Sequence, residues 1–250
     1  MNDPRRQFGA SVADARTGAA IDEGLRQYML GVYNYIAVGL VVSGLLAFAV
    51  STVPAIRDAL FVYVPQYGAY APTPLGSIVS WSPVAILLLN YFVPIGRTPQ
   101  GAQIFYWTIV TLIGASLGSI GLNFTGESIA RIFFITALSF GGMSLWGYTT
   151  KVDLTPVGSF LRFAVIGVFA VLMINGLLFQ ATGLQMIMSV GFLLLMGAAI
   201  AFNTQALKSL YLSTSNEGVL KVAAVHGALS LYISIINIFT ILMNLFGARD

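Results

Sequence analysis

Residues 222–248 read VAAVHGALSLYISIINIFTILMNLFGA, and no Asp, Glu, Lys or Arg interrupts them. A helix that crosses the hydrocarbon core of a bilayer needs about 20 apolar residues, so this stretch is long enough to cross. With about 100° of rotation per residue, five polar side chains of the stretch fall within an arc of about 80°. They are His226, Ser230, Ser234, Asn237 and Asn244. Because a polar stripe is costly in contact with lipid, we expect this helix to be central and surrounded by the others.

The polar stripe has two interpretations, and the sequence leaves both open. It either lines a pathway through the membrane or hydrogen-bonds the neighbouring helices, and the second interpretation requires no transported ligand. His226 is the only His in the chain. It is therefore the one side chain of the stripe whose charge changes near neutral pH, although a single His in a helix is more often a hydrogen-bonded packing residue.

The whole chain has the composition of a membrane protein. Of its 250 residues, 57% are hydrophobic and 8% are charged, whereas roughly 25% of the residues in soluble domains are charged. The charged residues cluster between long apolar segments, which predicts an all-α integral membrane protein with seven transmembrane helices and a central seventh helix. The predicted spans are Leu30–Val53, Leu75–Ile95, Ala102–Phe124, Ile129–Tyr148, Val157–Phe179, Leu184–Leu207 and Ala224–Phe246.

The pattern divides the chain into a polar N-terminal tail, residues 1–29, and a seven-helix transmembrane domain, residues 30–250. The tail lacks the early apolar core and cleavage site of a secretory signal, so we interpret it as a retained, partly disordered extension. Positive charge predicts the orientation. With the N-terminus in the cytoplasm, eight Lys and Arg residues lie in cytoplasmic segments and three lie outside, while Arg162 reaches back to the cytoplasmic face from the fifth span.

Patterns typical of catalysis and of metal binding are missing. The chain has no Cys, and its acidic residues lie in the tail, in loops and at helix ends. No glycine-rich loop with a following Lys and Ser or Thr precedes a helix. We therefore expect no enzymatic activity, no catalytic residues, no metal site and no cofactor. The formal net charge of +3 is too small to indicate binding to nucleic acid.

A specific resemblance covers most of the chain. Residues 133–161 read FFITALSFGGMSLWGYTTKVDLTPVGSFL, and the chain has VYNYIAVGLVVSG from Val32 and ALSLYISIINIF from Ala228. The first stretch resembles the signature region of the Bax inhibitor family, the transmembrane BAX inhibitor motif proteins. The other two resemble the first and last helices of that family. The resemblance implies a bacterial member with seven transmembrane helices.

The resemblance also implies a calcium leak governed by pH, which in relatives depends on two hydrogen-bonded aspartates. The sixth-helix motif Ala-Tyr-Asp-Thr-Gln corresponds here to AFNTQ, residues 201–205, so Asn203 replaces the first aspartate. In the seventh helix Ser234 replaces the second. An amide and a hydroxyl keep a hydrogen bond without charge, whereas Ca²⁺ is usually held by carboxylates. Arg97 matches an arginine that in relatives latches onto the sixth-helix aspartate, and this ion pair is lost with the acid.

Two functions follow from these observations. The favoured hypothesis is a non-enzymatic protein of the bacterial inner membrane that binds or modulates a membrane complex, such as the membrane-bound AAA protease, as the resemblance to bacterial relatives implies. The alternative is a leak channel for calcium or another ion, with its pH-sensing pair replaced by Asn203 and Ser234. The loss of both aspartates favours the first hypothesis. The expected surroundings are the lipid bilayer and possible membrane partners, without nucleic acid.

Overall fold

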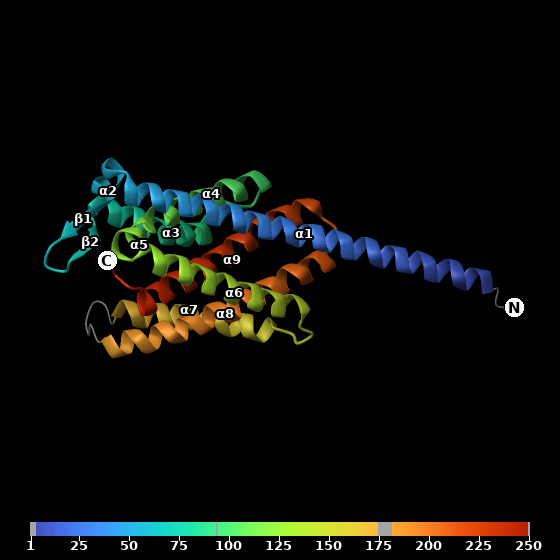
Figure 1. Ribbon diagram of the computed structural model, residues 1–250. Helices are drawn as coiled ribbons and strands as arrows, with labels where there is room; N and C mark the ends of the chain where they lie inside the picture. The colour runs from blue at the N-terminus through green and yellow to red at the C-terminus, as the bar shows by residue number, and fades with distance from the viewer. Residues whose placement is uncertain (1–3, 94, 175–181, 250) are drawn as a thin grey trace.

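The computed structural model of the chain describes residues 4–93, 95–174 and 182–249 (Figure 1). The helices and the two strands follow one another in a simple order. They are α1 (Pro4–Thr52), α2 (Pro54–Leu60), β1 (Phe61–Val64), β2 (Ala69–Pro72), α3 (Pro74–Phe92), α4 (Pro99–Ser116), α5 (Gly118–Asn123), α6 (Gly126–Thr149), α7 (Thr155–Ile174), α8 (Thr182–Ser213) and α9 (Glu217–Phe246).

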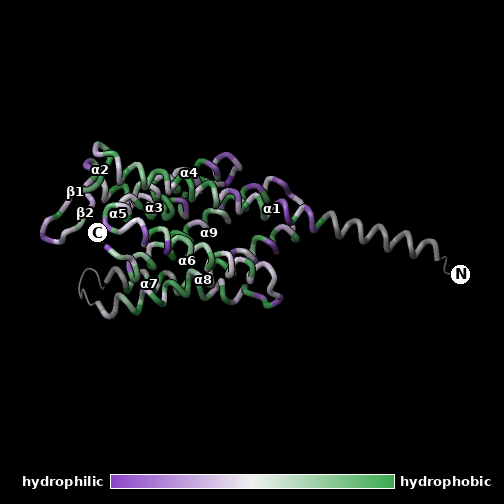
Figure 2. The backbone as a smooth tube through the Cα atoms, in the orientation of Figure 1, coloured by the Kyte–Doolittle hydropathy of each residue, from purple (hydrophilic) through white to green (hydrophobic). Residues whose placement is uncertain are grey.

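Five helical segments of the described residues are long and apolar enough to cross a membrane. They are Ile21–Thr52, Pro99–Asn123, Gly126–Thr149, Met186–Ser213 and Glu217–Phe246. Two shorter apolar helices, Pro74–Asn90 and Thr155–Val168, lie at the predicted second and fifth spans. Hydrophobic residues fill the middle of the bundle, and hydrophilic residues gather at its two ends (Figure 2). The chain is thus an α-helical membrane protein. Part of the predicted fifth span, residues 175–179, lies outside the described residues.

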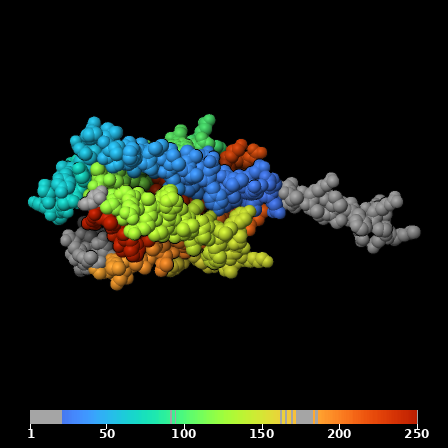
Figure 3. Space-filling view, viewed as in Figure 1, coloured from blue at the N-terminus to red at the C-terminus, as the bar shows by residue number. Residues whose placement is uncertain are grey.

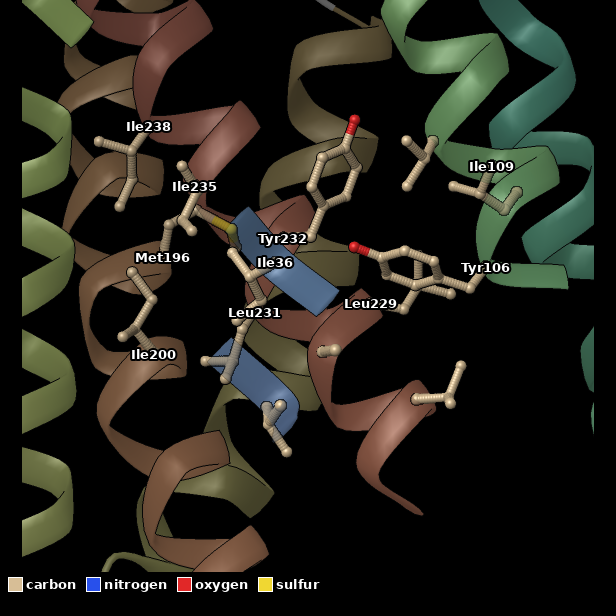
Figure 4. Packing of buried hydrophobic residues seen from close by; sticks show 14 of the residues in the cluster. Ile36, Tyr106, Ile109, Met196, Ile200, Leu229, Leu231, Tyr232, Ile235 and Ile238 are labelled. Carbon is tan, nitrogen blue, oxygen red and sulfur yellow. The ribbon is translucent and has the colours of Figure 1, made fainter. Parts of the chain in front are cut away.

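Helix α9 is the central helix. It packs mainly against α8, α1, α6 and α4, while α7 packs on α8 and α3 packs on α4. Among the five long spans it has the largest buried share, 44%, and α1 and α6 lie in front of it in Figure 3. In Figure 4 its residues Tyr232 and Ile235 lie among residues of α4 and α8. The predicted central position of the last helix is confirmed, and four helices surround it closely.

Local capping fixes the start of several helices. The side chains of Thr73, Thr98, Thr125 and Asn216 each accept a hydrogen bond from a backbone N–H in the first turn of α3, α4, α6 and α9, respectively. Prolines follow two of these caps, at the first positions of α3 and α4. A proline is favourable there because that position has no intrahelical N–H bond to lose. The caps end the connecting loops and set where each helix enters the bundle.

A β-hairpin interrupts the helical fold between α2 and α3. Strands β1 and β2 pair antiparallel, with Phe61 opposite Pro72 and Val64 opposite Ala69. Gly68 in the turn has a φ of 58°, which a residue without a Cβ adopts readily. The Asn123 side chain accepts from the Tyr70 N–H at 2.8 Å and donates to the Tyr70 carbonyl at 3.2 Å. The spans predicted from the sequence do not include this hairpin, because two strands of four residues give little periodicity.

The polar N-terminal segment is helical from Pro4 and continuous with the first span, so α1 has 49 residues. The sequence had suggested a partly disordered tail for residues 1–29, whereas the structure continues α1 back through this segment. Figure 1 shows α1 standing beyond the other helices at one end of the bundle. The C-terminus and the hairpin lie at the opposite end.

Candidate functional site

The stretch AFNTQ on α8 is a docking surface for α6 and for the loop after it. Thr204 is fully buried, and its hydroxyl lies 3.1 Å from the Ser144 hydroxyl of α6. Ser144 in turn lies 2.7 Å from the Tyr33 hydroxyl of α1. Thr204 also donates to the Ile200 carbonyl at 2.8 Å, which leaves its oxygen free to accept from Ser144. A chain of three hydroxyls therefore joins α1, α6 and α8.

Next to this chain, the α6–α7 loop is held by side chains of α8. The Gln205 amide accepts from the Leu154 N–H at 2.8 Å and donates to the Val152 carbonyl at 2.7 Å. The Lys208 ammonium donates to the Tyr148 carbonyl at 2.8 Å and lies 4.8 Å from the centre of the Tyr148 ring. These contacts satisfy backbone groups that the ends of α6 and α7 would otherwise leave unpaired.

Asp153 closes the same loop. Its carboxylate accepts from the Thr155 hydroxyl at 2.6 Å and from the Thr155 N–H at 2.9 Å. These hydrogen bonds lower the pKa of Asp153, because they favour the charged form. Asp153 is exposed, so it acts as a turn residue at the start of α7 rather than as an acid inside the bundle.

Two glycines of the signature stretch allow the close approach. A Cβ on Gly147 would lie 2.7 Å from Ala201 Cα and 2.8 Å from the Ala201 carbonyl carbon, and a Cβ on Gly158 would meet the Phe202 ring. Real Cβ atoms do not approach other atoms so closely. The signature stretch and the AFNTQ stretch therefore form one packed unit, in which small residues let the helix backbones touch.

The structure does not join Asn203 to Ser234. Asn203 is half-buried and Ser234 is buried, but Ser234 donates to the Ser230 carbonyl at 3.0 Å. No hydrogen bond between Asn203 and Ser234 occurs in the described part of the chain. The expectation that the replaced pair keeps its hydrogen bond was wrong, because a serine side chain is short and bonds to its own helix. Arg97 is exposed in the α3–α4 connection and, among the described residues, has no ion pair.

The polar stripe of α9 is not one continuous lining. The His226 ring lies 2.9 Å from the Gly96 carbonyl and so joins α9 to the α3–α4 connection. Ser230 and Asn244 are exposed, and Asn244 donates to the Thr240 carbonyl of its own helix. Among the described residues, the Asn237 amide donates to the Met196 sulfur, at 3.7 Å. Individual residues of the stripe bond to neighbouring backbone and side chains.

Replacing Asn237 with leucine is expected to change stability little. Interhelical hydrogen bonds in membranes contribute about 0.6 kcal/mol on average, and a bond to a thioether sulfur is weaker than one to oxygen. The thermal unfolding midpoint of the purified protein in detergent measures this. Leu88→Asn, on an exposed face of α3, is the control for adding an amide outside the bundle. A large loss of stability in Asn237→Leu would show that the asparagine carries a stronger contact.

A tyrosine cluster was missed by the sequence analysis. The Tyr106 hydroxyl donates to the Tyr35 carbonyl at 2.6 Å, and the Tyr232 and Ser43 hydroxyls are 2.6 Å apart. Ser43 also donates to the Val110 carbonyl at 3.2 Å. Tyr106 and Tyr232 are fully buried and lie close together in Figure 4. Tyr232 lies in the stretch that resembles the last helix of the Bax inhibitor family. That resemblance was the only feature of the sequence that pointed to this tyrosine.

The fold and this packed unit define a class of membrane protein, and comparison with known proteins identifies it. The model of the family "Inhibitor of apoptosis-promoting Bax1" matches residues 25–250. The chain therefore belongs to the Bax inhibitor family. The resemblance found in the sequence is confirmed.

Individual relatives are bacterial proteins of similar length. An uncharacterized protein of Caulobacter vibrioides is 46% identical, over 100% of this chain and 99% of its own. The uncharacterized protein RP147 of Rickettsia prowazekii is 39% identical, over 91% of this chain and 92% of its own. The inner membrane protein YbhL of Escherichia coli is 31% identical, over 90% of this chain and 93% of its own.

Proposed function

We propose that this protein is a non-enzymatic component of the bacterial inner membrane that binds or modulates a larger membrane complex, such as the membrane-bound AAA protease. The inner membrane is proposed from the similarity to YbhL, which is an inner membrane protein. The observation that carries the proposal is α1, a single helix of 49 residues. At about 1.5 Å per residue it is more than twice as long as the roughly 30 Å hydrocarbon core. Its first part therefore lies beyond the bilayer.

Figure 1 shows the first part of α1 projecting beyond the other helices, and we propose that a partner binds there. Its sequence carries charges of both signs, among them Arg5, Arg6 and Arg16. Charges on a projecting helix steer association with a partner of complementary charge. The alternative is that this segment is a solvated, positively charged anchor on the cytoplasmic side that binds no protein partner.

Affinity purification tests the partner proposal. The full chain and a variant lacking residues 2–20, both tagged at the C-terminus, are purified from native membranes in mild detergent, and the proteins that co-purify are identified. We expect the AAA protease to co-purify with the full chain and to be lost with the shortened one. The reciprocal purification, with the tag on the protease, should recover only the full chain. Equal recovery of the protease with both chains, or with neither, would contradict the proposal.

The ion leak remains the alternative function, and the buried hydroxyls argue against it. Ser43, Ser128, Thr136, Ser144, Thr204 and Ser234 are the buried polar residues of the described chain. Each takes part in a hydrogen bond to backbone or to another hydroxyl. An ion that leaves water needs oxygen ligands in place of its hydration shell. Hydroxyls already bonded in the structure are poor replacements.

We propose seven crossings of the membrane, with α3 and α7 as the two shortest spans and the N-terminus in the cytoplasm. The opposite placement of the two chain ends in Figure 1 supports an odd number of crossings. The distribution of Lys and Arg supports the orientation. A reporter that is active only in the cytoplasm should work when fused before residue 1 and fail after residue 250. Equal activity at both ends would exclude an odd number of spans.

A further inference from the structure

A lateral groove lies between α1 and α6 in the half of the bundle nearest the hairpin. It has a volume of about 410 Å³, within the roughly 300–1,000 Å³ typical of small-molecule sites. Helix α9 supplies its floor through Ile235, Ile236 and Phe239, and α5 closes one end with Ile120. Phe48 of α1 and Phe134 of α6 line it and are exposed, so the groove opens at the membrane-facing surface. The helices α1 and α6 lie on the visible face of Figure 3.

The groove persists because α1 and α6 make little direct contact along it. At the other end of the bundle the Tyr33–Ser144 hydrogen bond joins these two helices. At the groove, small residues leave the space open. A Cβ on Gly44 or on Gly126 would meet no atom within 4 Å, whereas one on Gly114 would lie 2.8 Å from Ser43 Cα. Gly44 and Gly126 therefore line a space, while Gly114 packs a helix contact.

The polar groups that line the groove are already used. Ser43 bonds to the Val110 carbonyl and to Tyr232. Thr136 donates to the Ile132 carbonyl, and Ser51 donates to the Phe48 carbonyl. The remaining lining is apolar. Among the described residues, the hydroxyl donors of the groove are therefore used and its lining carries no charge. This lining favours a hydrocarbon over an ion or a sugar.

We propose that this groove binds one acyl chain of a membrane phospholipid. The groove runs along α1 from Leu40 to Ser51, a rise of about 16 Å at 1.5 Å per residue. One leaflet of the roughly 30 Å hydrocarbon core is about 15 Å thick. The groove is thus about as long as one leaflet is thick. It opens toward the hydrocarbon of the bilayer. An acyl chain that packs against α9 makes van der Waals contacts with the residues that line the groove. These residues would lack such contacts if the groove were empty.

Native mass spectrometry of the purified full chain tests this after extensive washing in mild detergent. We expect the parent to retain one phospholipid per chain, and Gly44→Phe to lose most of it because the ring fills the groove. Gly31→Phe is the matched control, since Gly31 is an exposed glycine of α1 with open space around it that does not line the groove. It should retain the lipid. A parent without retained lipid, or equal retention in Gly44→Phe, would overturn the proposal.

A second measurement does not require the groove to be filled by mutation. The chain has no Cys, so Ala47→Cys places a single thiol in the groove and Ala137→Cys places one on the exposed side of α6. Delipidated protein is treated with a small apolar maleimide, with and without added phosphatidylglycerol. The lipid should slow the labelling of Ala47→Cys several-fold and leave Ala137→Cys unchanged. If the lipid slows the labelling equally at both positions, or at neither, nothing occupies the groove specifically.

Discussion

Replacing Gly147 with alanine is expected to lower the free energy of unfolding by about 1–3 kcal/mol, the usual range for an overpacked core. The added Cβ would lie within 2.8 Å of three backbone atoms of Ala201. Backbone cannot turn aside as a flexible side chain can, so α6 and α8 must separate. Separation weakens the Ser144–Thr204 hydrogen bond and the anchoring of the α6–α7 loop by Gln205. The larger Gly147→Leu should leave little folded protein.

Gly142→Ala is the matched control on the same helix and in the same signature stretch. Gly142 is exposed, and a Cβ there meets no atom within 4 Å. Alanine is the better helix former by up to about 1 kcal/mol, so this variant should equal the parent or exceed it slightly. The measurement is the thermal unfolding midpoint in detergent, together with the yield of monodisperse protein. Similar midpoints for the two alanine variants would contradict the close approach of α6 and α8.

The second prediction with a large effect concerns pH. The parent is expected to show weak calcium flux in liposomes, without a steep change between about pH 6 and pH 8, because Asn203 and Ser234 carry no charge there. The double variant Asn203→Asp, Ser234→Asp places two carboxyls in a poorly hydrated part of the bundle. Burial should raise the apparent pKa of at least the carboxyl at position 234 by about one to three units.

A raised pKa has a definite consequence for stability. A carboxyl whose pKa is higher in the folded state than in the unfolded state binds more protons when folded. The stability of the double variant should therefore fall as the pH rises above the unfolded value, by about 1.4–4 kcal/mol in total. The thermal midpoint, measured between about pH 4 and pH 8 so that the range begins near the unfolded pKa of Asp, should fall for the double variant and stay level for the parent.

Calcium entry into dye-loaded vesicles completes this test. The double variant should acquire a pH-dependent flux, and each single variant should show less, because an isolated buried carboxyl simply stays protonated. Ser234→Ala is the neutral control at the buried position. A strong pH-dependent leak in the parent would show that the leak does not need the aspartate pair, and the channel would then become the favoured function.

The site was predictable only in part. The resemblance identified Asn203 and Ser234 as the positions of the two aspartates in relatives. It also suggested a hydrogen bond between them, which the described part of the structure does not contain. Conversely, Thr204 and Gln205 were not singled out, yet they form the contacts that hold α8 to α6 and to the α6–α7 loop. Residues one position apart on a helix point about 100° apart. Which of them meets a neighbour depends on how the helix is rotated.

The sequence by itself determined the membrane class, the family, the places where apolar helices occur, and the absence of a carboxyl pair at positions 203 and 234. These properties follow from the cost of moving each residue into lipid and from local motifs, both of which can be read along the chain. Only the tertiary structure decided which four helices surround α9, that Gly147 touches α8, and that α1 and α6 leave a groove between them. Those features depend on the relative rotation and spacing of helices far apart in sequence. Because lipid is as apolar as the side chains, hydropathy cannot distinguish a face that packs on protein from one that faces the bilayer.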